Sequence, residues 1–231
     1  MSSSPQFLLQ SLLFQGMPEQ DRQAVLDRAR VRPFPAGRLI FHQDEPVGEL
    51  LLMTRGRVRL FQLTPDGHQL ILHIAGPGEE IGLLPALMET RSTVSAQAVE
   101  DATALAWDAS EFRTLMRRFP DLGFNAIAIL GEHIRLYQDR IRELTTERVE
   151  RRLARTLLRL AKQLGVRTSQ GVLIDLPLSR QHLAEMSGTT LYSASRILRA
   201  WEESGIVSSG RERVTILSPH KLVAIAEDLQ R

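Results

Sequence analysis

The sequence predicts an α+β protein: short helices, an antiparallel β-roll, a long helix and a C-terminal part rich in helices. Apolar residues recur at helical spacing before residue 31, alternate with a period near two over 31–107, and return to helical spacing afterwards. Glycine-containing turns divide 31–107 into short runs, which is typical of an antiparallel barrel or roll. The 231 residues are enough for two ordinary domains with apolar cores.

Short helices are predicted over residues 7–30, the first of them over Phe7–Phe14. The roll is predicted from short apolar runs, which include residues 38–41, 49–53, 57–63 and 69–74. Asp66-Gly67 lies between the last two runs and predicts a tight hairpin there, because this dipeptide adopts the turn that two-residue hairpins need.

A helix is predicted from Asp108, and a long one from Pro120. Apolar residues in the long helix step alternately by three and four, flanked by charged residues, over nearly three heptads. These residues are Ile127, Leu130, Ile134, Tyr137, Ile141 and Leu144. The 3.5-residue period favours pairing with a second copy, so we expect a homodimer interface. An ordinary helix packed on its own domain is the alternative.

The C-terminal part predicts a winged helix-turn-helix. After a helix over 150–164, residues 165–175 read as a loop with one short strand from Val172. Two helices follow, over 178–188 with Ser179 as N-cap and over 191–205. Their expected packing positions are Leu183, Met186, Leu191, Ala194, Ile197 and Leu198. Residues 206–217 predict two strands around Gly210, a β wing. We expect a domain over 1–119, the long helix over 120–147 and the winged domain over 148–231.

Composition excludes several classes of protein. The chain has no cysteine, so it cannot form a disulfide, a thiolate nucleophile or a cysteine-ligated iron–sulfur cluster. Its six histidines include no His-x-His pair, and no metal site is predicted. Apolar runs are far shorter than the roughly 20 residues of a membrane span, and no secretory signal is recognisable. We expect a cytoplasmic protein with no membrane partner.

Charge is unevenly distributed. Residues 1–147 carry 15 arginines against 19 acidic residues, whereas residues 148–231 carry 14 basic against 8 acidic residues. The basic C-terminal part predicts a polyanion-binding surface there. Only Lys162 and Lys221 are lysines.

Several stretches, in their order and spacing, resemble the bacterial cyclic-AMP receptor protein / fumarate–nitrate regulator (CRP/FNR) superfamily of transcription factors. They are Leu13-Phe-Gln-Gly16, Gly37-x-x-Ile40-Phe41, Gly56-x-Val58-x-Leu60, Asp66-Gly67, Gly78-x-x-Ile81-Gly82, the Pro120-Asp121 helix, and Leu178-Ser-Arg-Gln181 through Ser195-Arg-Ile-Leu198. The resemblance implies a jelly-roll-like, cyclic-nucleotide-binding-type domain, a dimerisation helix and a winged helix-turn-helix. It implies a homodimeric regulator, not an enzyme, that binds a near-palindromic double-stranded DNA site under the control of an effector and contacts RNA polymerase.

The same resemblance assigns the DNA-reading residues. In the family, a Glu-x-x-Ser/Gly-Arg pattern on the second helix reads the half-site; Ser195-Arg196 match its end, and Tyr192 stands at the glutamate position. Arg196 is expected on guanine O6/N7, and Tyr192 on a phosphate or a thymine methyl, or as a helix cap against a phosphate. The other expected DNA contacts are Ser179, Arg180, Gln181, Thr190, Ser193, Arg199, Arg211 and Arg213.

The effector site departs from the family pattern. Cyclic-nucleotide binders hold the ribose with a Gly-Glu-Leu turn and the phosphate with an Arg-Ser pair; here Leu83 follows Gly82, and Arg91-Ser92-Thr93 come about two residues early. Tyr137 or Gln138 falls where the family touches the purine.

The effector is left open between cyclic AMP, haem and no ligand. Haem, through His42, His68, His73 or His133, is the weaker candidate, because lone histidines are more often structural. A purely cyclic-nucleotide- or haem-binding sensory module is a rival function, although the basic winged helix-turn-helix argues against it. A cupin-like β-roll enzyme is the other rival, but the chain lacks a His-x-His cluster, and that function would leave the helix-turn-helix unexplained.

Overall fold

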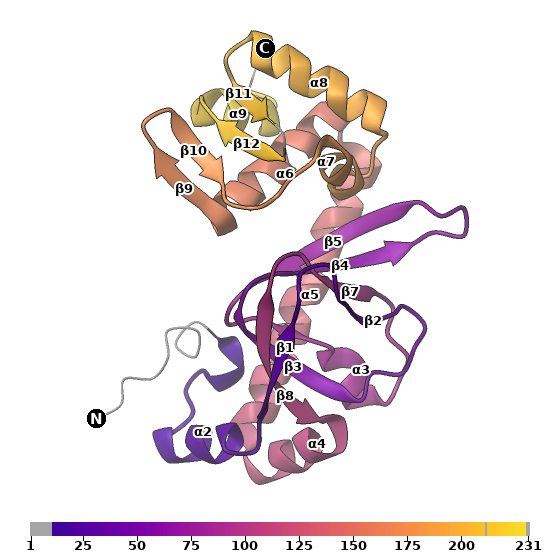
Figure 1. Ribbon diagram of the computed structural model, residues 1–231, viewed down its shortest axis with the longest axis vertical. Coiled ribbons are helices and arrows are strands. Elements are labelled where there is room, and N and C mark those ends of the chain that lie inside the picture. Colours follow the sequence, from indigo (N-terminus) through magenta and orange to yellow (C-terminus); the bar gives the residue numbers. More distant parts are fainter. Residues whose placement is uncertain (1–10, 211, 230–231) are drawn as a thin grey trace. The chain divides into compact units, whose positions relative to one another are not determined.

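The computed structural model describes residues 11–210 and 212–229. The chain forms two compact units, the first ending at Tyr137 and the second beginning at Gln138. This boundary lies inside the long helix α5 (Pro120–Thr146), so each unit contains part of that helix. The architecture confirms the predicted α+β class (Figure 1).

The roll of the first unit consists of two four-stranded antiparallel sheets, with strand orders β1-β8-β3-β6 and β2-β7-β4-β5 (Figure 1). The strands are β1 (Arg30–Phe34), β2 (Leu39–Phe41), β3 (Glu49–Arg55), β4 (Val58–Leu63), β5 (Gln69–Ala75), β6 (Glu80–Ile81), β7 (Ser95–Ala98) and β8 (Ala102–Asp108). The first and last strands are neighbours, since Arg30 pairs with Ala106. Leu51, Met53 and Val58 belong to a buried cluster inside the roll.

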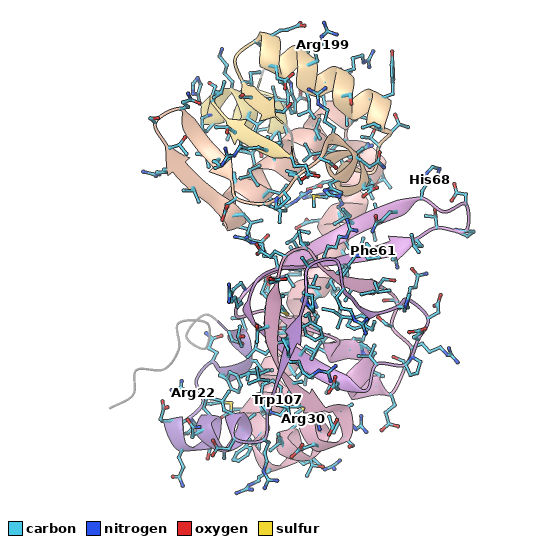
Figure 2. The ribbon with its side chains drawn as sticks, viewed as in Figure 1. Arg22, Arg30, Phe61, His68, Trp107 and Arg199 are labelled. Carbon is cyan, nitrogen blue, oxygen red and sulfur yellow. The ribbon has the colours of Figure 1, made fainter. Side chains whose placement is uncertain are left out.

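Glycine turns set the hairpins of the roll. A hairpin at Asp66-Gly67 is confirmed, because β4 and β5 pair on either side of it, but residues 64–68 connect the strands instead of a tight two-residue turn; Figure 2 labels His68 in this loop. Between β3 and β4, Gly56 has a φ of +73°, and a Cβ added there would lie 2.5 Å from the carbonyl oxygen of Asp101. This turn therefore requires glycine for both its conformation and its space.

Helices pack on a second apolar cluster of this unit. They are the 3-10 turn η1 (Leu12–Phe14) and the helices α2 (Glu19–Leu26), α3 (Leu83–Met88) and α4 (Ala109–Arg118). Trp107, labelled in Figure 2, is fully buried there, and its indole N–H donates to the carbonyl of Val25 at 2.8 Å.

The helix predicted over residues 7–14 is a 3-10 turn where the structure describes it, and residues 7–10 lie outside the described part. The Ser11 hydroxyl accepts from the Leu13 N–H at 3.2 Å and so caps a single turn.

Where it is described, the second unit combines the last turns of α5 and four further helices with a four-stranded sheet of order β11-β12-β10-β9. After the end of α5 come α6 (Val149–Leu164), β9 (Gly165–Thr168), β10 (Gly171–Ile174), α7 (Arg180–Ser187), α8 (Leu191–Glu203), β11 (Val207–Gly210), β12 (Arg213–Ile216) and α9 (Pro219–Ala226). The loop with one strand predicted over 165–175 is wrong, because β9 pairs with β10 as a hairpin. The helix-turn-helix and the wing are confirmed as α7–α8 and β11–β12.

Among the described residues, no helix combines the length and apolarity that crossing a bilayer requires.

Candidate nucleic-acid interface and effector site

Side chains of the same segment cap the free backbone N–H groups at the start of α7. The Ser179 hydroxyl accepts from the His182 N–H at 3.1 Å, and the Ser179 N–H donates to His182 Nδ1 at 3.4 Å, which makes a reciprocal capping box. Arg180 donates to Glu202 and to the Ser209 hydroxyl, each at 3.1 Å, and Gln181 donates to Glu185 at 2.8 Å. In the free chain, these three predicted DNA contacts are thus engaged within the unit.

Helix α8 presents a different surface. The Thr190 hydroxyl caps it by accepting from the Ser193 N–H at 3.2 Å, so these two residues order its first turn. Tyr192 is 77% exposed, and Arg196, one turn later, is exposed and has no hydrogen bond or ion pair with any described residue. Ser195 beside it is half-buried.

Arg199 lies on the exposed side of α8 and forms an ion pair with Glu203 at 3.2 Å (Figure 2). The wing continues the basic character, since Arg213 opens β12 and is exposed. Arg211, also expected in the wing, lies outside the described residues. Exposed arginines on a recognition helix and a wing are typical of a surface that meets a phosphate backbone.

Arg152 on α6 ties the turn before α8 to the end of α5. Its Nε and Nη2 donate to the carbonyls of Ser187 and Gly188, both at 3.0 Å, and its Nη1 donates to the carbonyl of Glu147 at 2.9 Å. These are carbonyls at two helix ends, which lack partners within their helices. One guanidinium therefore positions the helix-turn-helix against the last turns of α5 within this unit.

A buried ion-pair group supports the same joint. Glu143 is 6% exposed and pairs with Arg159 at 2.5 Å and Arg140 at 3.3 Å. Burial, followed by the charge of Arg159, lowers the pKa of Arg140. Removing one partner of such a group leaves an uncompensated buried charge, so loss of either arginine is expected to destabilise this joint.

The turn expected to bind a ribose is apolar, and the side chain that follows its glycine is buried. Gly82 has a φ of +79° and precedes α3, whose first residue, Leu83, is 3% exposed. Leu83 packs in the same cluster as Leu50 and Trp107. Position 83 therefore contributes to the core rather than to a polar binding surface.

The expected phosphate-binding residues have partners inside the roll. Arg91 is exposed and donates to the carbonyl of Asp44 at 2.6 Å, whereas the Ser92 hydroxyl is buried and donates to the carbonyl of Val94 at 2.7 Å. Thr93 is exposed. On α5, Tyr137 is 43% exposed, with its pKa raised by burial, and Gln138 is exposed.

A cluster of histidines and glutamates in the first unit was not assigned from the sequence. His73 on β5 lies 3.3 Å from Glu79, and His133 on α5 lies 3.6 Å from Glu80. Burial, followed by the charge of Glu79, raises the pKa of Glu80 to about 7. The adjacent glutamates Glu79 and Glu80 were the available clue. Neighbouring side chains of an extended chain point to opposite faces, so one of these two carboxylates has to point into the protein and needs a partner there.

The other three groups of this cluster respond to each other's charges. Burial opposes the charge on His73, but its hydrogen bond with Glu79 and the charge of that carboxylate outweigh burial and raise the pKa of His73. Burial likewise opposes the charge on Glu79, yet the partnership with His73 lowers its pKa. Burial and the charge of His73 lower the pKa of His133. Within residues 11–210 and 212–229, no three such side chains are placed to hold a metal ion.

The outer face of α5 carries uncovered apolar side chains. Ile127, Ile134 and Ile141, each seven residues apart, are 64%, 57% and 61% exposed. Of the other expected interface residues, Leu130 packs partly against its own core, and Leu144 is half-buried in the second unit. Phe124, which the sequence interpretation left out, is 69% exposed.

Comparisons with known proteins agree with this arrangement. Residues 31–119 match the cyclic nucleotide-binding domain family, and residues 151–225 match the Crp-like helix-turn-helix domain family. The chain is 33% identical over 217 residues to the cyclic AMP receptor protein of Thermus thermophilus, covering 94% of this chain and 97% of that protein.

Two solved structures are also similar. The catabolite activator protein of Thermus thermophilus has a TM-score of 0.56 at 32% identity, covering 95% of this chain and all of that one. CooA of Carboxydothermus hydrogenoformans has a TM-score of 0.74 at 23% identity, covering 98% and 97%, and shares the fold.

Proposed function

Because this chain belongs to the CRP/FNR family of DNA-binding, effector-controlled transcriptional regulators, we propose that it reads a near-palindromic DNA site as a homodimer through α8. The observation that carries the proposal is the exposed guanidinium of Arg196 on the helix that follows the turn, which has no partner in the described part of the chain. An arginine so presented fits guanine O6/N7 in the major groove. Membership of this family also sets the rival enzyme function aside.

The regulator family implies dimerisation, and we propose that the stripe of Ile127, Ile134 and Ile141 on α5 is the dimer contact. Their exposure in a single chain and their seven-residue spacing support this, since such a stripe buries itself in a two-stranded pairing. Two copies of α8 related by a two-fold axis then meet half-sites about one helical turn apart. RNA polymerase is the proposed further partner, and we propose the boundaries 1–119, 120–147 and 148–231 as functional parts.

The Arg196→Ala variant is expected to lose roughly 10- to 100-fold in affinity for a selected site while its non-specific binding changes little. The reason is that the lost contact reads a base rather than the backbone. Binding titrations on both DNAs measure the two affinities, and sizing should show an unchanged dimer.

The matched control is Arg167→Ala, which removes the same charge from exposed β9 of the same unit. Unaltered specific binding by Arg196→Ala would contradict the base-reading role. For the native protein, the logarithm of affinity should fall linearly with the logarithm of salt concentration. An affinity independent of salt would contradict phosphate contacts altogether.

The effector is proposed to be a ligand that is not held through a ribose hydroxyl. The burial of Leu83 in the core supports this, and the engagement of Arg91 and Ser92 within the roll also disfavours a cyclic phosphate there. The identity of the Thermus relative as a cyclic AMP receptor makes cyclic AMP the ligand to test first.

Calorimetric titration of the purified protein with cyclic AMP is therefore expected to show no binding stronger than about 100 µM, because one charged contact is absent and the others are occupied. Several temperatures are needed, since the binding enthalpy can vanish at one of them. Micromolar binding would contradict the proposal and would require Arg91 to leave Asp44.

A further inference from the structure

The first turn of the proposed recognition helix is apolar on its exposed side. Leu191 was expected from the sequence to pack inside the unit, yet it is 47% exposed, and its neighbour Tyr192 is 77% exposed. The buried face of α8 is instead supplied by Ala194, Leu198 and Trp201. The cap at Thr190 orders this turn, so both side chains project from a formed helix.

The exposed leucine and tyrosine at this place offer a small apolar surface to a partner. The surface around them is basic, with Arg196 one turn later and Arg199 beyond it, so a polyanion is the favoured partner. Among base pairs, only T·A presents an apolar group in the major groove, the C5-methyl of thymine. Against a G·C pair, a leucine would cover hydrogen-bonding groups without satisfying them, which is unfavourable.

We propose that Leu191 and Tyr192 form a thymine-methyl contact that selects T·A base pairs beside the base read by Arg196. This inference rests on the proposed function, because it requires α8 to enter the major groove. Leucine provides the apolar contact, while the tyrosine ring adds apolar area and its hydroxyl hydrogen-bonds a neighbouring acceptor. The specificity of this regulator at these positions then comes from methyl groups, since neither side chain carries a carboxylate.

The test begins with selection of a binding site from random duplex DNA by the full-length protein. Each thymine of the selected half-site is then replaced in turn by deoxyuridine, which removes only the methyl group. We expect one or two positions to lose roughly fourfold in affinity per methyl, and the loss to shrink below twofold in the Leu191→Ala or Tyr192→Ala variant. The same T·A pair is also replaced by C·G and by 5-methylcytosine·G. The methylated pair should bind more tightly than the unmethylated one, because it restores a methyl group at the same position.

Both residues are exposed, so these variants are expected to fold, and circular dichroism checks this. Val166→Ala is the matched control, since Val166 is 49% exposed on β9 of the same unit, and it should leave the deoxyuridine effect unchanged. Selected sites whose affinity is insensitive to every deoxyuridine, or equal sensitivity in the wild type and both variants, would overturn the methyl contact while leaving the proposed function intact. Failure to select any sequence would instead overturn the proposed function.

Discussion

A chain carrying both Ile127→Asp and Ile134→Asp is expected to be a monomer whose affinity for a palindromic site falls at least 100-fold. Both side chains are more than half exposed in the single chain, so the changes leave its core intact. They place two carboxylates on each of the two apolar stripes that would otherwise face each other, and like charges brought out of water repel. Losing the dimer removes the second half-site contact, which multiplies affinity by about 10² to 10⁴.

Sedimentation and binding titrations measure this result. Met88→Asp is a matched control, because Met88 is 64% exposed and belongs to α3 rather than to the apolar stripe of α5. A double variant that remained dimeric would show that the interface uses another surface. A monomer that bound the palindrome with native affinity would show that dimerisation does not contribute to DNA recognition.

The Glu80→Gln variant is expected to be more stable than the wild type at pH 8, by at most about 3 kcal/mol, and equally stable near pH 4. The pKa of Glu80 is raised from 4.5 to about 7 in the folded chain. Between these values the unfolded chain releases a proton that the folded chain keeps, so rising pH destabilises the fold. Above pH 7 the buried carboxylate of Glu80 is charged, and the free-energy cost of burying that charge persists. The neutral amide of glutamine does not carry this cost.

Thermal unfolding at a series of pH values measures this difference, which corresponds to roughly 5–10 °C in the Tm of the first unit. Glu79→Gln is the matched comparison, with the opposite expected sign. The pKa of Glu79 is lowered by its partner His73, so its charge stabilises the fold above its unfolded pKa, and the amide loses that contribution. Stability changes of opposite sign in the two variants would support the raised pKa of Glu80 and the lowered pKa of Glu79. A Glu80→Gln variant less stable than the wild type at pH 8 would contradict the argument that burial of the charged carboxylate is unfavourable.

Local patterns in the sequence were sufficient to predict the roll, the long helix and the winged helix-turn-helix. The switch of apolar period, the Asp66-Gly67 turn and the Ser179 cap act over a few residues, so they can be recognised without coordinates. The partner of Arg180 could not be foreseen in this way, because Glu202 lies 22 residues away and meets it only after α7 and α8 pack.

Periodicity also cannot say which element covers an apolar face. Leu130 and Ile134 share one heptad pattern, yet the first packs partly in its own core and the second is exposed. Leu191 looked like a core residue because it fits the helical period, although it lies in the first turn of α8, where little covers it. The contacts of His73 and His133 with the glutamates bring together β5, β6 and α5, elements that no local spacing relates.

The strand order of the roll has a consequence for how the chain folds. β8 lies between β1 and β3, so Arg30 must find Ala106 before the sheet is complete. Bringing together segments so distant in sequence costs loop-closure entropy that is recovered only when they pair. In the second unit, the β9–β10 and β11–β12 hairpins and the α7–α8 pair connect neighbours along the chain, whereas β10 and β12 pair only after α7 and α8 have been placed between them. Because contacts between distant segments form more slowly than local ones, we expect the pairing of β8 with β1 to form later than the local hairpins of either unit.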